Sequence, residues 1–362
     1  MLAARGGIVF PRLVVDTAKI EQNTRVVVGM CAEHGVSVVG VTKACGGAPQ
    51  VAEAMLRGGV AGLADSRVDN LERLLHIDAE KMLVRSPLHC DMDRAVKAAQ
   101  LSLNSEPATL RAIDEACERQ GVEEHGVILA YDLGDLREGF TNRNELMECA
   151  EAAQSLKHVR VRGIGANLNC LSFIQPDTEK LSELVDAARE MQRRFGIDNI
   201  TVSGGNSATI HMMLHEGLPE GINQLRLGES LLLGRERAHY AYLPGTSNES
   251  FIFEAEILEL KDKPSKPWGT VGPDSYGVIH EFEDTGMQRR ALVAFGHLDA
   301  DLDVMWPTDP QVKAVASSSD HSVLDLTECD RDYQVGDTVQ LRCGYHAAAH
   351  AFASPYVEKV YV

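Results

Sequence analysis

The first two thirds of the chain alternate between short apolar runs and amphipathic stretches, and this alternation limits the folds that the chain can adopt. The stretches between the runs repeat apolar residues at the i, i+3 and i+4 spacing of a helix that covers a core. Near-continuous apolar strands that alternate with such helices are typical of parallel strands buried on both faces. The eight apolar runs are residues 36–43, 60–67, 81–86, 101–106, 127–135, 161–168, 200–207 and 224–230.

Eight parallel strands are the number that closes a (β/α)8 barrel. A doubly wound open sheet is the structural alternative, but no GxGxxG turn follows an early strand. After the turn-rich segment PGTSNES (244–250), the apolar runs are short, often alternating, and separated by Gly, Pro and Asp, which indicates a mostly antiparallel β domain. We therefore predict an α/β fold with an N-terminal (β/α)8 TIM-like barrel over residues 17–244, and a β domain formed by residues 1–16 and 245–362.

Composition and charge exclude several classes of protein. The 362 residues include 35 Lys or Arg and 53 Asp or Glu, and the formal net charge of −18 without a basic cluster argues against a nucleic-acid partner. No apolar run approaches the roughly 20 residues that span a bilayer, so we expect no membrane partner, and the opening segment is a poor signal peptide. The eight cysteines show no paired spacing, which is typical of a cytoplasmic protein without a disulfide framework or a metal site.

Lys43 is the strongest single candidate for chemistry, because it directly follows the apolar run VVGVT (38–42). We expect this strand to be buried on both faces, and burial lowers the pKa of a lysine. A neutral amine is a nucleophile that can form a Schiff base with a carbonyl compound. The alternative is a structural lysine whose ammonium group reaches solvent at the end of the strand.

The Gly-rich run SGGNSAT (203–209) lies between the seventh predicted strand and the next helix. Its amides and the hydroxyls of Ser203 and Ser207 can face an anion at the helix N-terminus, and barrels often bind phosphate at this position. The alternative is a tight loop with a capping residue.

Two arginines follow other predicted strands. Arg137 lies in the loop after the fifth strand and is suited to bind a carboxylate in a bidentate manner, or to pair with Asp135 or Glu138. Arg226, in the last strand, is suited to face a ring nitrogen or the acid Glu229.

Taken together, these motifs resemble the fold-type III enzymes that depend on pyridoxal 5'-phosphate (PLP), the alanine racemase superfamily, and most of all its ornithine racemase-like branch. The resemblance covers the whole chain and implies a PLP-dependent racemase (an isomerase) for a basic amino acid such as ornithine or lysine. It also implies a homodimer with shared active sites. The motifs are VTK (41–43), LADSR (63–67), LNSE (103–106), DLGDLREG (132–139), SGGNS (203–207), LRLGE (225–229) and SSDH (318–321).

The resemblance assigns roles to individual residues. Lys43 matches the Schiff-base lysine, and Arg137 matches an arginine near the cofactor's phenolic oxygen and the substrate carboxylate. Ser319 and Asp320 match a loop of the β domain that reaches into the partner's site. A basic substrate would also need an acid for its distal ammonium, and Asp301 is a candidate, beside Asp299 and Asp303; the alternative is that these acids form a solvated loop. The residues expected at the cofactor besides Lys43 are Asn167, Ser203, Asn206, Ser207, Arg226, Gly228, Glu229 and Tyr345.

The chain also departs from the pattern of alanine racemase. Asn167 replaces a histidine beside the cofactor ring, ACGGAP (44–49) lacks a tyrosine, and Ala130 replaces a lysine that can be carbamylated. In the stretch that supplies the second base, GHLD (296–299) has His297 in the place of a tyrosine. We therefore nominate Lys43 and the partner's His297 as the two bases; the alternative for His297 is a surface histidine.

Three alternatives to a racemase stay open at this point. One is another PLP reaction on the same scaffold, such as amino-acid decarboxylation or the cleavage catalysed by D-threonine-type aldolases, for which His321 and His346 would be candidate metal ligands. The second is a non-catalytic PLP carrier, which the extra β domain disfavours. The third is a barrel enzyme that does not use PLP.

Overall fold

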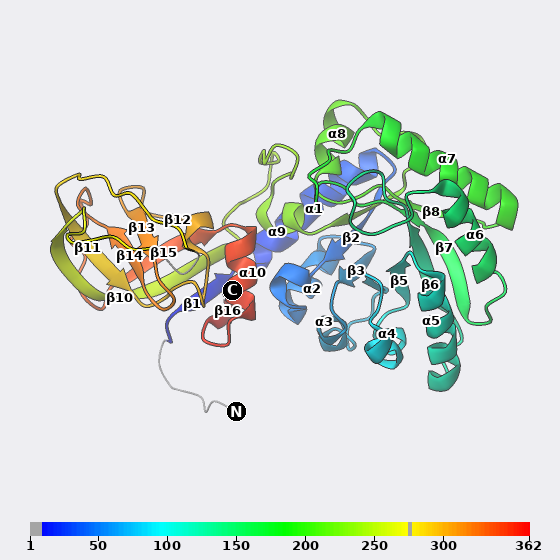
Figure 1. The fold of residues 1–362 in the computed structure, drawn as a ribbon, viewed down its shortest axis with the longest axis horizontal. Coiled ribbons are helices and arrows are strands. Elements are labelled where there is room, and N and C mark those ends of the chain that lie inside the picture. Colours follow the sequence, from blue (N-terminus) through cyan, green and yellow to red (C-terminus); the bar gives the residue numbers. More distant parts are fainter. Residues whose placement is uncertain (1–8, 274–276) are drawn as a thin grey trace. The chain divides into compact units, whose positions relative to one another are not determined.

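The computed structural model describes residues 9–273 and 277–362 (Figure 1). It divides into two compact units. Asp16–Ser250 forms one unit, and the described residues up to Val15 together with Phe251–Val362 form the other. The units divide between residues 250 and 251, whereas the boundary predicted from the sequence lies between residues 244 and 245, within the turn-rich segment 244–250.

The larger unit is a closed barrel of eight parallel strands, which confirms the predicted (β/α)8 architecture. The barrel closes where β9 pairs with β2, with Val38 opposite Leu225 and Gly40 opposite Leu227. Each predicted apolar run overlaps one of its strands, and β6 and β7 begin two residues before their runs. They are β2 (Ser37–Val41), β3 (Gly62–Asp65), β4 (Lys81–Leu83), β5 (Leu101–Asn104), β6 (His125–Ala130), β7 (Val159–Gly165), β8 (Thr201–Ser203) and β9 (Gln224–Leu227).

Helices follow the strands and surround the barrel (Figure 1). Side chains define several of their starts: Asp16 accepts a hydrogen bond from the Lys19 amide at the start of α1, and Asp177 accepts one from the Lys180 amide at the start of α7. Such caps satisfy amides that have no partner within the helix. The helices are α1 (Thr17–Glu33), α2 (Pro49–Arg57), α3 (Val68–Arg73), α4 (Met92–Ala98), α5 (Pro107–Gln120), α6 (Arg143–Ala153), α7 (Thr178–Phe195), α8 (Thr209–His215) and α9 (Glu229–Leu233), with 3-10 turns η1 (Lys43–Cys45) and η2 (His89–Asp91).

The strands fill the barrel with every second side chain. An inner cluster contains Val39 and Val41 from β2 and Ile128 and Ala130 from β6, whereas Val127 and Leu129 of β6 join a second cluster with the helices. This alternation follows from the two-residue period of a strand. The barrel is therefore a packed core, and polar side chains gather where the strands end.

The smaller unit is built on an eight-stranded, mostly antiparallel sheet, as predicted. Its order is β12-β15-β10-β11-β14-β13, and β1 pairs antiparallel with β10 and parallel with β16. Among the described residues, no helix is long and apolar enough to cross a membrane. The elements are β1 (Arg12–Val15), β10 (Phe251–Pro264), β11 (Met287–Val293), η3 (Leu302–Val304), β12 (Met305–Pro307), β13 (Lys313–Ser317), β14 (Ser322–Asp325), β15 (Thr338–Cys343), α10 (Tyr345–Ala353) and β16 (Glu358–Tyr361).

Candidate functional site

Arg226 is a buried cation at the carboxyl end of the barrel. Its guanidinium donates one hydrogen bond from Nη1 to Ser203 Oγ and another from Nη2 to the Ala166 carbonyl at 2.7 Å, so it joins the ends of β7, β8 and β9. A Cβ on Gly165 would lie 3.1 Å from Arg226 Nη1, so the glycine leaves the room that the guanidinium occupies. Burial lowers the pKa of Arg226 to about 10, below the value expected from its type, but it still carries its charge at neutral pH.

Lys43 lies at the same end of the barrel; the strand before it is buried as expected, but the lysine itself is not. Strand β2 ends at Val41, and the chain turns into η1 beginning with Lys43, whose side chain is exposed. Val39 and Val41 belong to the inner cluster of the barrel, and Lys43 follows two residues later, beyond the end of the strand. The amine is therefore carried just beyond the packed core, where an incoming carbonyl compound can reach it.

The turn before Lys43 is fixed by a buried carboxylate. Asp65, at the end of β3, accepts hydrogen bonds from Thr42 Oγ1 at 2.8 Å, from Asn70 Nδ2 at 3.0 Å and from the Arg67 amide at 3.0 Å. Burial raises the pKa of Asp65, and the hydrogen bonds from Thr42 and Asn70 act in the opposite direction. Asp65 thus links the ends of β2 and β3 directly beside the residue that we expect to react.

The predicted phosphate turn is joined to the turn after β9. The buried Ser207 Oγ lies 3.1 Å from Ser230 Oγ and accepts a hydrogen bond from the Ser230 amide at 3.2 Å. Ser230 was not among the predicted residues, because a serine just inside a short helix gives no distinct sequence signal. The contact places Ser207 beside Gly228 and Glu229, which precede Ser230 in the chain, and so joins the predicted phosphate turn to two other residues expected at the cofactor.

An unpaired donor lies next to this turn. Asn206 Nδ2 donates to Asn167 Oδ1 at 3.1 Å and to the Leu168 carbonyl at 2.8 Å, and this contact joins two predicted cofactor residues. The Nδ2 atom of Asn167 is buried and has no hydrogen-bond partner among the described residues. A buried polar group without a partner is costly, so a ligand with an acceptor would satisfy it.

The side chain of Glu229 has a structural role. Its buried carboxylate pairs with Arg235 Nη2 at 2.6 Å and with Arg237 Nη1 at 3.3 Å. Of the two partners that the sequence left open for Arg226, Glu229 is not the one found, since the barrel places Arg226 against Ser203 and Glu229 against other arginines. Only the backbone amide of Glu229 is left for a phosphate group.

The loop after β6 is braced by two aspartates. Asp132 Oδ1 accepts hydrogen bonds from the amides of Gly134 at 2.9 Å and Leu136 at 3.1 Å. The buried carboxylate of Asp135 accepts hydrogen bonds from three successive amides in the loop after β7, those of Cys170, Leu171 and Ser172. The two loops are thereby fixed to each other.

Arg137 pairs with Glu138 on this braced loop, which decides between the two acids left open by the sequence. Nε and Nη2 of Arg137 donate to the two carboxylate oxygens of Glu138. The charges of Glu138 and Arg137 shift the pKa of Arg226 in opposite directions, upward and downward respectively, so the pair lies within electrostatic range of the buried cation. The loop therefore carries its ion pair at the same end of the barrel.

Two segments of the β unit that contain predicted residues lie side by side. The amide of His297 donates to the Ser318 carbonyl at 2.8 Å, and the next amide along, that of Leu298, donates to the Ser319 carbonyl at 3.1 Å. The His297 side chain is exposed. Ser319 Oγ donates to Asp320 Oδ2 at 2.9 Å.

The other predicted residues of this unit lie near its single described helix or its 3-10 turn. Asp301 caps η3 by accepting a hydrogen bond from the Asp303 amide at 3.2 Å. The buried Asp299 accepts a hydrogen bond from Ser354 Oγ at 3.1 Å. Tyr345 is half-buried and begins α10. Among the residues that the structure describes, no group of three or more His, Cys, Asp or Glu side chains could hold a metal ion.

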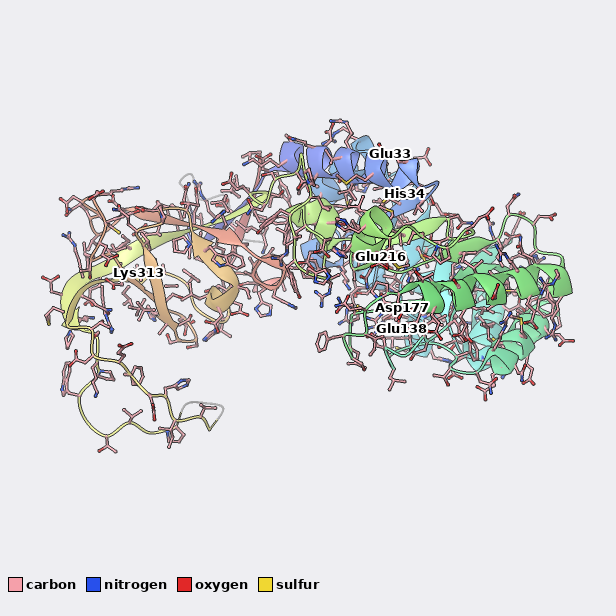
Figure 2. All side chains as sticks on the ribbon, turned by 90° about the horizontal axis from the view of Figure 1, so that it is seen from above. Glu33, His34, Glu138, Asp177, Glu216 and Lys313 are labelled. Carbon is pink, nitrogen blue, oxygen red and sulfur yellow. The ribbon has the colours of Figure 1, made fainter. Side chains whose placement is uncertain are left out.

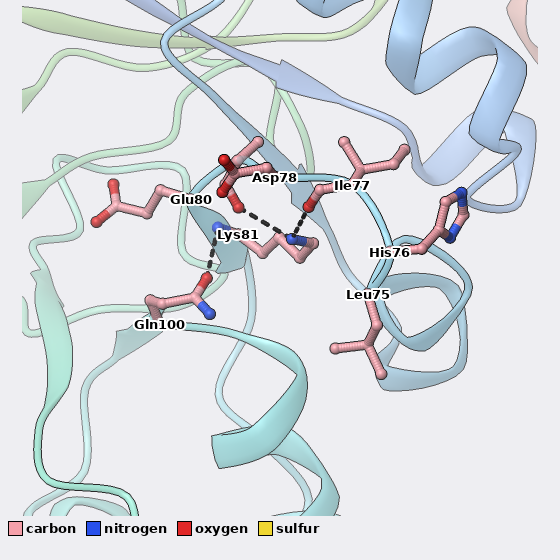
Figure 3. Close-up of a pocket in the computed structure, with 8 residues that line it drawn as sticks. Leu75, His76, Ile77, Asp78, Glu80, Lys81 and Gln100 are labelled. Carbon is pink, nitrogen blue, oxygen red and sulfur yellow. Dashed lines mark hydrogen bonds between the residues drawn. The ribbon is translucent and has the colours of Figure 1, made fainter.

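A pocket at the amino ends of the strands is separate from these residues (Figure 3). It is lined by residues 75–81 and Gln100, and its buried Lys81 donates from Nζ to the carbonyls of Ile77 at 2.7 Å and Ala79 at 2.9 Å. Lys81 begins β4, whereas Lys43 follows the end of β2, so the two lysines lie at opposite ends of the parallel barrel. The amine of Lys81 is therefore already hydrogen-bonded to backbone carbonyls of the neighbouring turn.

Comparisons with known proteins relate this chain to amino-acid racemases. The sequence profile of the alanine racemase N-terminal domain matches residues 15–236. An ornithine racemase of Acetoanaerobium sticklandii is 37% identical over 350 residues, which cover 97% of this chain and 99% of that protein. A lysine racemase of Thermotoga maritima is 36% identical over 355 residues, which cover 98% and 99% respectively. The fold is similar to that of an alanine racemase of Clostridium difficile 630, with a TM-score of 0.75, 18% identity, and coverage of 98% and 97%.

Proposed function

The chain belongs to the alanine racemase family, and from that premise we propose that it is a PLP-dependent racemase whose substrate is a basic amino acid such as ornithine or lysine. The observation that carries the proposal is the similarity, at 36–37% identity over nearly the full length, to racemases of ornithine and lysine. The alanine racemases of similar fold are far more distant in sequence, so they support the fold alone.

The residues at the carboxyl end of the barrel fit the cofactor. The exposed amine of Lys43 suits covalent attachment of an aldehyde, and Asn167 Nδ2 supplies a buried donor that has no partner within residues 9–273 and 277–362. Ser207 and the amides of Gly228 and Glu229 would hold the phosphate, and Arg226 would face the ring nitrogen. When bound, PLP withdraws electrons from the substrate and makes its Cα proton acidic.

Each residue has a distinct task in the reaction. Arg226, with a pKa of about 10, keeps its proton at neutral pH and offers the ring a hydrogen-bond donor. Arg137 orients the substrate carboxylate through its planar guanidinium. Racemisation requires a proton to leave one face of Cα and another to arrive on the opposite face. Lys43 Nζ would serve one face, and the imidazole of His297 of the partner subunit would serve the other, in a homodimer that shares its active sites.

A racemisation screen tests the substrate. The purified holoenzyme would be incubated separately with single enantiomers of ornithine, lysine, arginine, alanine and serine, and the loss of optical rotation followed. We expect the highest kcat/KM with ornithine or lysine. A preference for alanine or serine would contradict the proposed substrate class, and the absence of racemisation with a full complement of PLP would contradict the activity itself.

A further inference from the structure

Glu138, the partner of Arg137, differs from three other acidic residues at this end of the barrel. Asp65, Asp135 and Glu229 are buried, and each is held by two or more donors of the protein. Glu138 is partly exposed, and its side chain is held by its neighbour Arg137. Of these four acids, it is the one that a ligand can reach.

The loop holds this pair in a defined place. Gly139, with φ of 124°, follows it directly, and a Cβ at this position would lie 2.6 Å from the Asp132 amide nitrogen. That amide donates to the Phe140 carbonyl at 2.9 Å, and the Phe140 amide donates to the Ala130 carbonyl at 3.0 Å, which closes the base of the loop. A group presented by a closed and braced loop is preorganised for binding.

Two of the three acids nominated from the sequence for the distal ammonium are less suited to that role. Asp299 is buried, with Gly296 N and Ser354 Oγ as donors to its carboxylate. Asp301 caps the turn that begins η3. Both carboxylates therefore already accept hydrogen bonds from the β unit. Glu138, by contrast, belongs to the barrel loop that also carries Arg137.

We propose that Glu138, which is labelled in Figure 2, binds the distal ammonium of a diamino-acid substrate, and that the substrate replaces the Arg137–Glu138 pair when it binds. The α-carboxylate of the substrate forms an ion pair with Arg137, and its ω-ammonium group forms one with Glu138. One ion pair within the protein becomes two ion pairs with the ligand, so every charge stays paired. This inference rests on the proposed function, because it requires a substrate with a second amine.

The exchange agrees with the exposure of the pair. The side chains of Arg137 and Glu138 are 37% and 27% exposed, and ion pairs that water can reach contribute little stability, so opening this pair costs little. The carboxylate of a neutral amino acid would pair with Arg137, but Glu138 would then be left without a cation beside it. The same device would therefore favour basic substrates and disfavour neutral ones, which is how specificity often arises.

Two ligands of matched shape test the proposal. Ornithine and norvaline have the same carbon chain, and norvaline lacks the distal amine. Their dissociation constants for the holoenzyme would be measured from changes in its visible spectrum, together with kcat/KM for ornithine, in the wild type, Glu138→Gln and Glu138→Asp. Glu190→Gln is a matched control, because Glu190 pairs with Arg143 at 2.9 Å with similar side-chain exposures of 29% and 34%, on helices α7 and α6.

We expect Glu138→Gln to weaken ornithine binding roughly 10- to 100-fold, as for the loss of a charged hydrogen-bond partner. Norvaline binding should stay the same or become tighter, Glu138→Asp should retain part of the preference for ornithine, and Glu190→Gln should change neither constant. Equal weakening of both ligands would mean that Glu138 only orients Arg137, and no weakening of either would also overturn the proposal. If the wild type racemises no diamino acid, the proposed function fails instead, independently of this comparison.

Discussion

His125, at the start of β6, gives a prediction about stability and pH. It is 2% exposed, and its Nε2 lies 2.8 Å from Ser102 Oγ, which also accepts a hydrogen bond from Asn104 Nδ2 at 2.9 Å. Burial lowers the pKa of His125 from 6.5 to about 4, so the folded protein keeps the ring neutral over most of the acidic range. In the unfolded chain the same ring binds a proton at about pH 6.5.

The sign and the size of the effect follow from these two pKa values. Between pH 6.5 and about 4 the unfolded state binds more protons than the folded state, so stability falls as the pH is lowered through this range. At about 1.36 kcal/mol per pKa unit, the difference amounts to about 3 kcal/mol once the pH is below 4. At pH 5 about 2 kcal/mol is already lost, and at pH 7.5 almost none.

Urea unfolding at pH 7.5 and pH 5 measures this contribution. His125→Asn removes the titrating ring, and His76→Asn is the control, because His76 is exposed. We expect the wild type and His76→Asn to lose about 2 kcal/mol more than His125→Asn between the two pH values. If the wild type and His125→Asn show the same dependence on pH, His125 is not held neutral by burial and the reasoning is refuted.

Two further substitutions test the packing of the site. Gly165→Ala places a methyl group about 3.1 Å from Arg226 Nη1. We expect the free energy of unfolding in urea to fall by about 1–3 kcal/mol, and PLP binding in a spectral titration to weaken. Unchanged values in both assays would show that the guanidinium has room to move. Glu229→Gln leaves Arg235 and Arg237 without their buried carboxylate, and we expect the free energy of unfolding to fall by about 3–5 kcal/mol, whereas a loss below about 1 kcal/mol would argue against a buried ion pair.

The barrel could be predicted from the sequence because its signal is spread over many residues. Each strand is a nearly continuous apolar run, and the helices repeat their own spacing, so an error of one or two residues changes neither pattern. Strand β12 (Met305–Pro307) was missed, because three residues that end in proline carry no periodic signal. Its pairing with β15 depends on residues distant in the sequence.

The site was predicted less completely, because its geometry depends on where each strand ends. The sequence left open whether Lys43 is buried with its strand or reaches solvent; β2 stops at Val41 and leaves the lysine exposed. Arg226 and Glu229 are close in sequence, but one lies in a strand and the other in a helix, so they have different partners. The choice of Glu138 as the partner of Arg137 is likewise a property of the folded loop, in which Asp135 is already held by three amides.

The central claim is that Lys43 holds PLP at the carboxyl end of the barrel and takes part in racemisation. The most direct measurement is the visible absorbance spectrum of the purified protein with PLP, followed by chiral analysis of ornithine and lysine, for the wild type, Lys43→Ala and Lys97→Ala. Lys97 is an exposed lysine of helix α4 and serves as the control. We predict that the wild type and Lys97→Ala have a visible cofactor band and racemise the substrate, and that Lys43→Ala loses both. A Lys43→Ala protein that keeps the band and the activity would contradict the account.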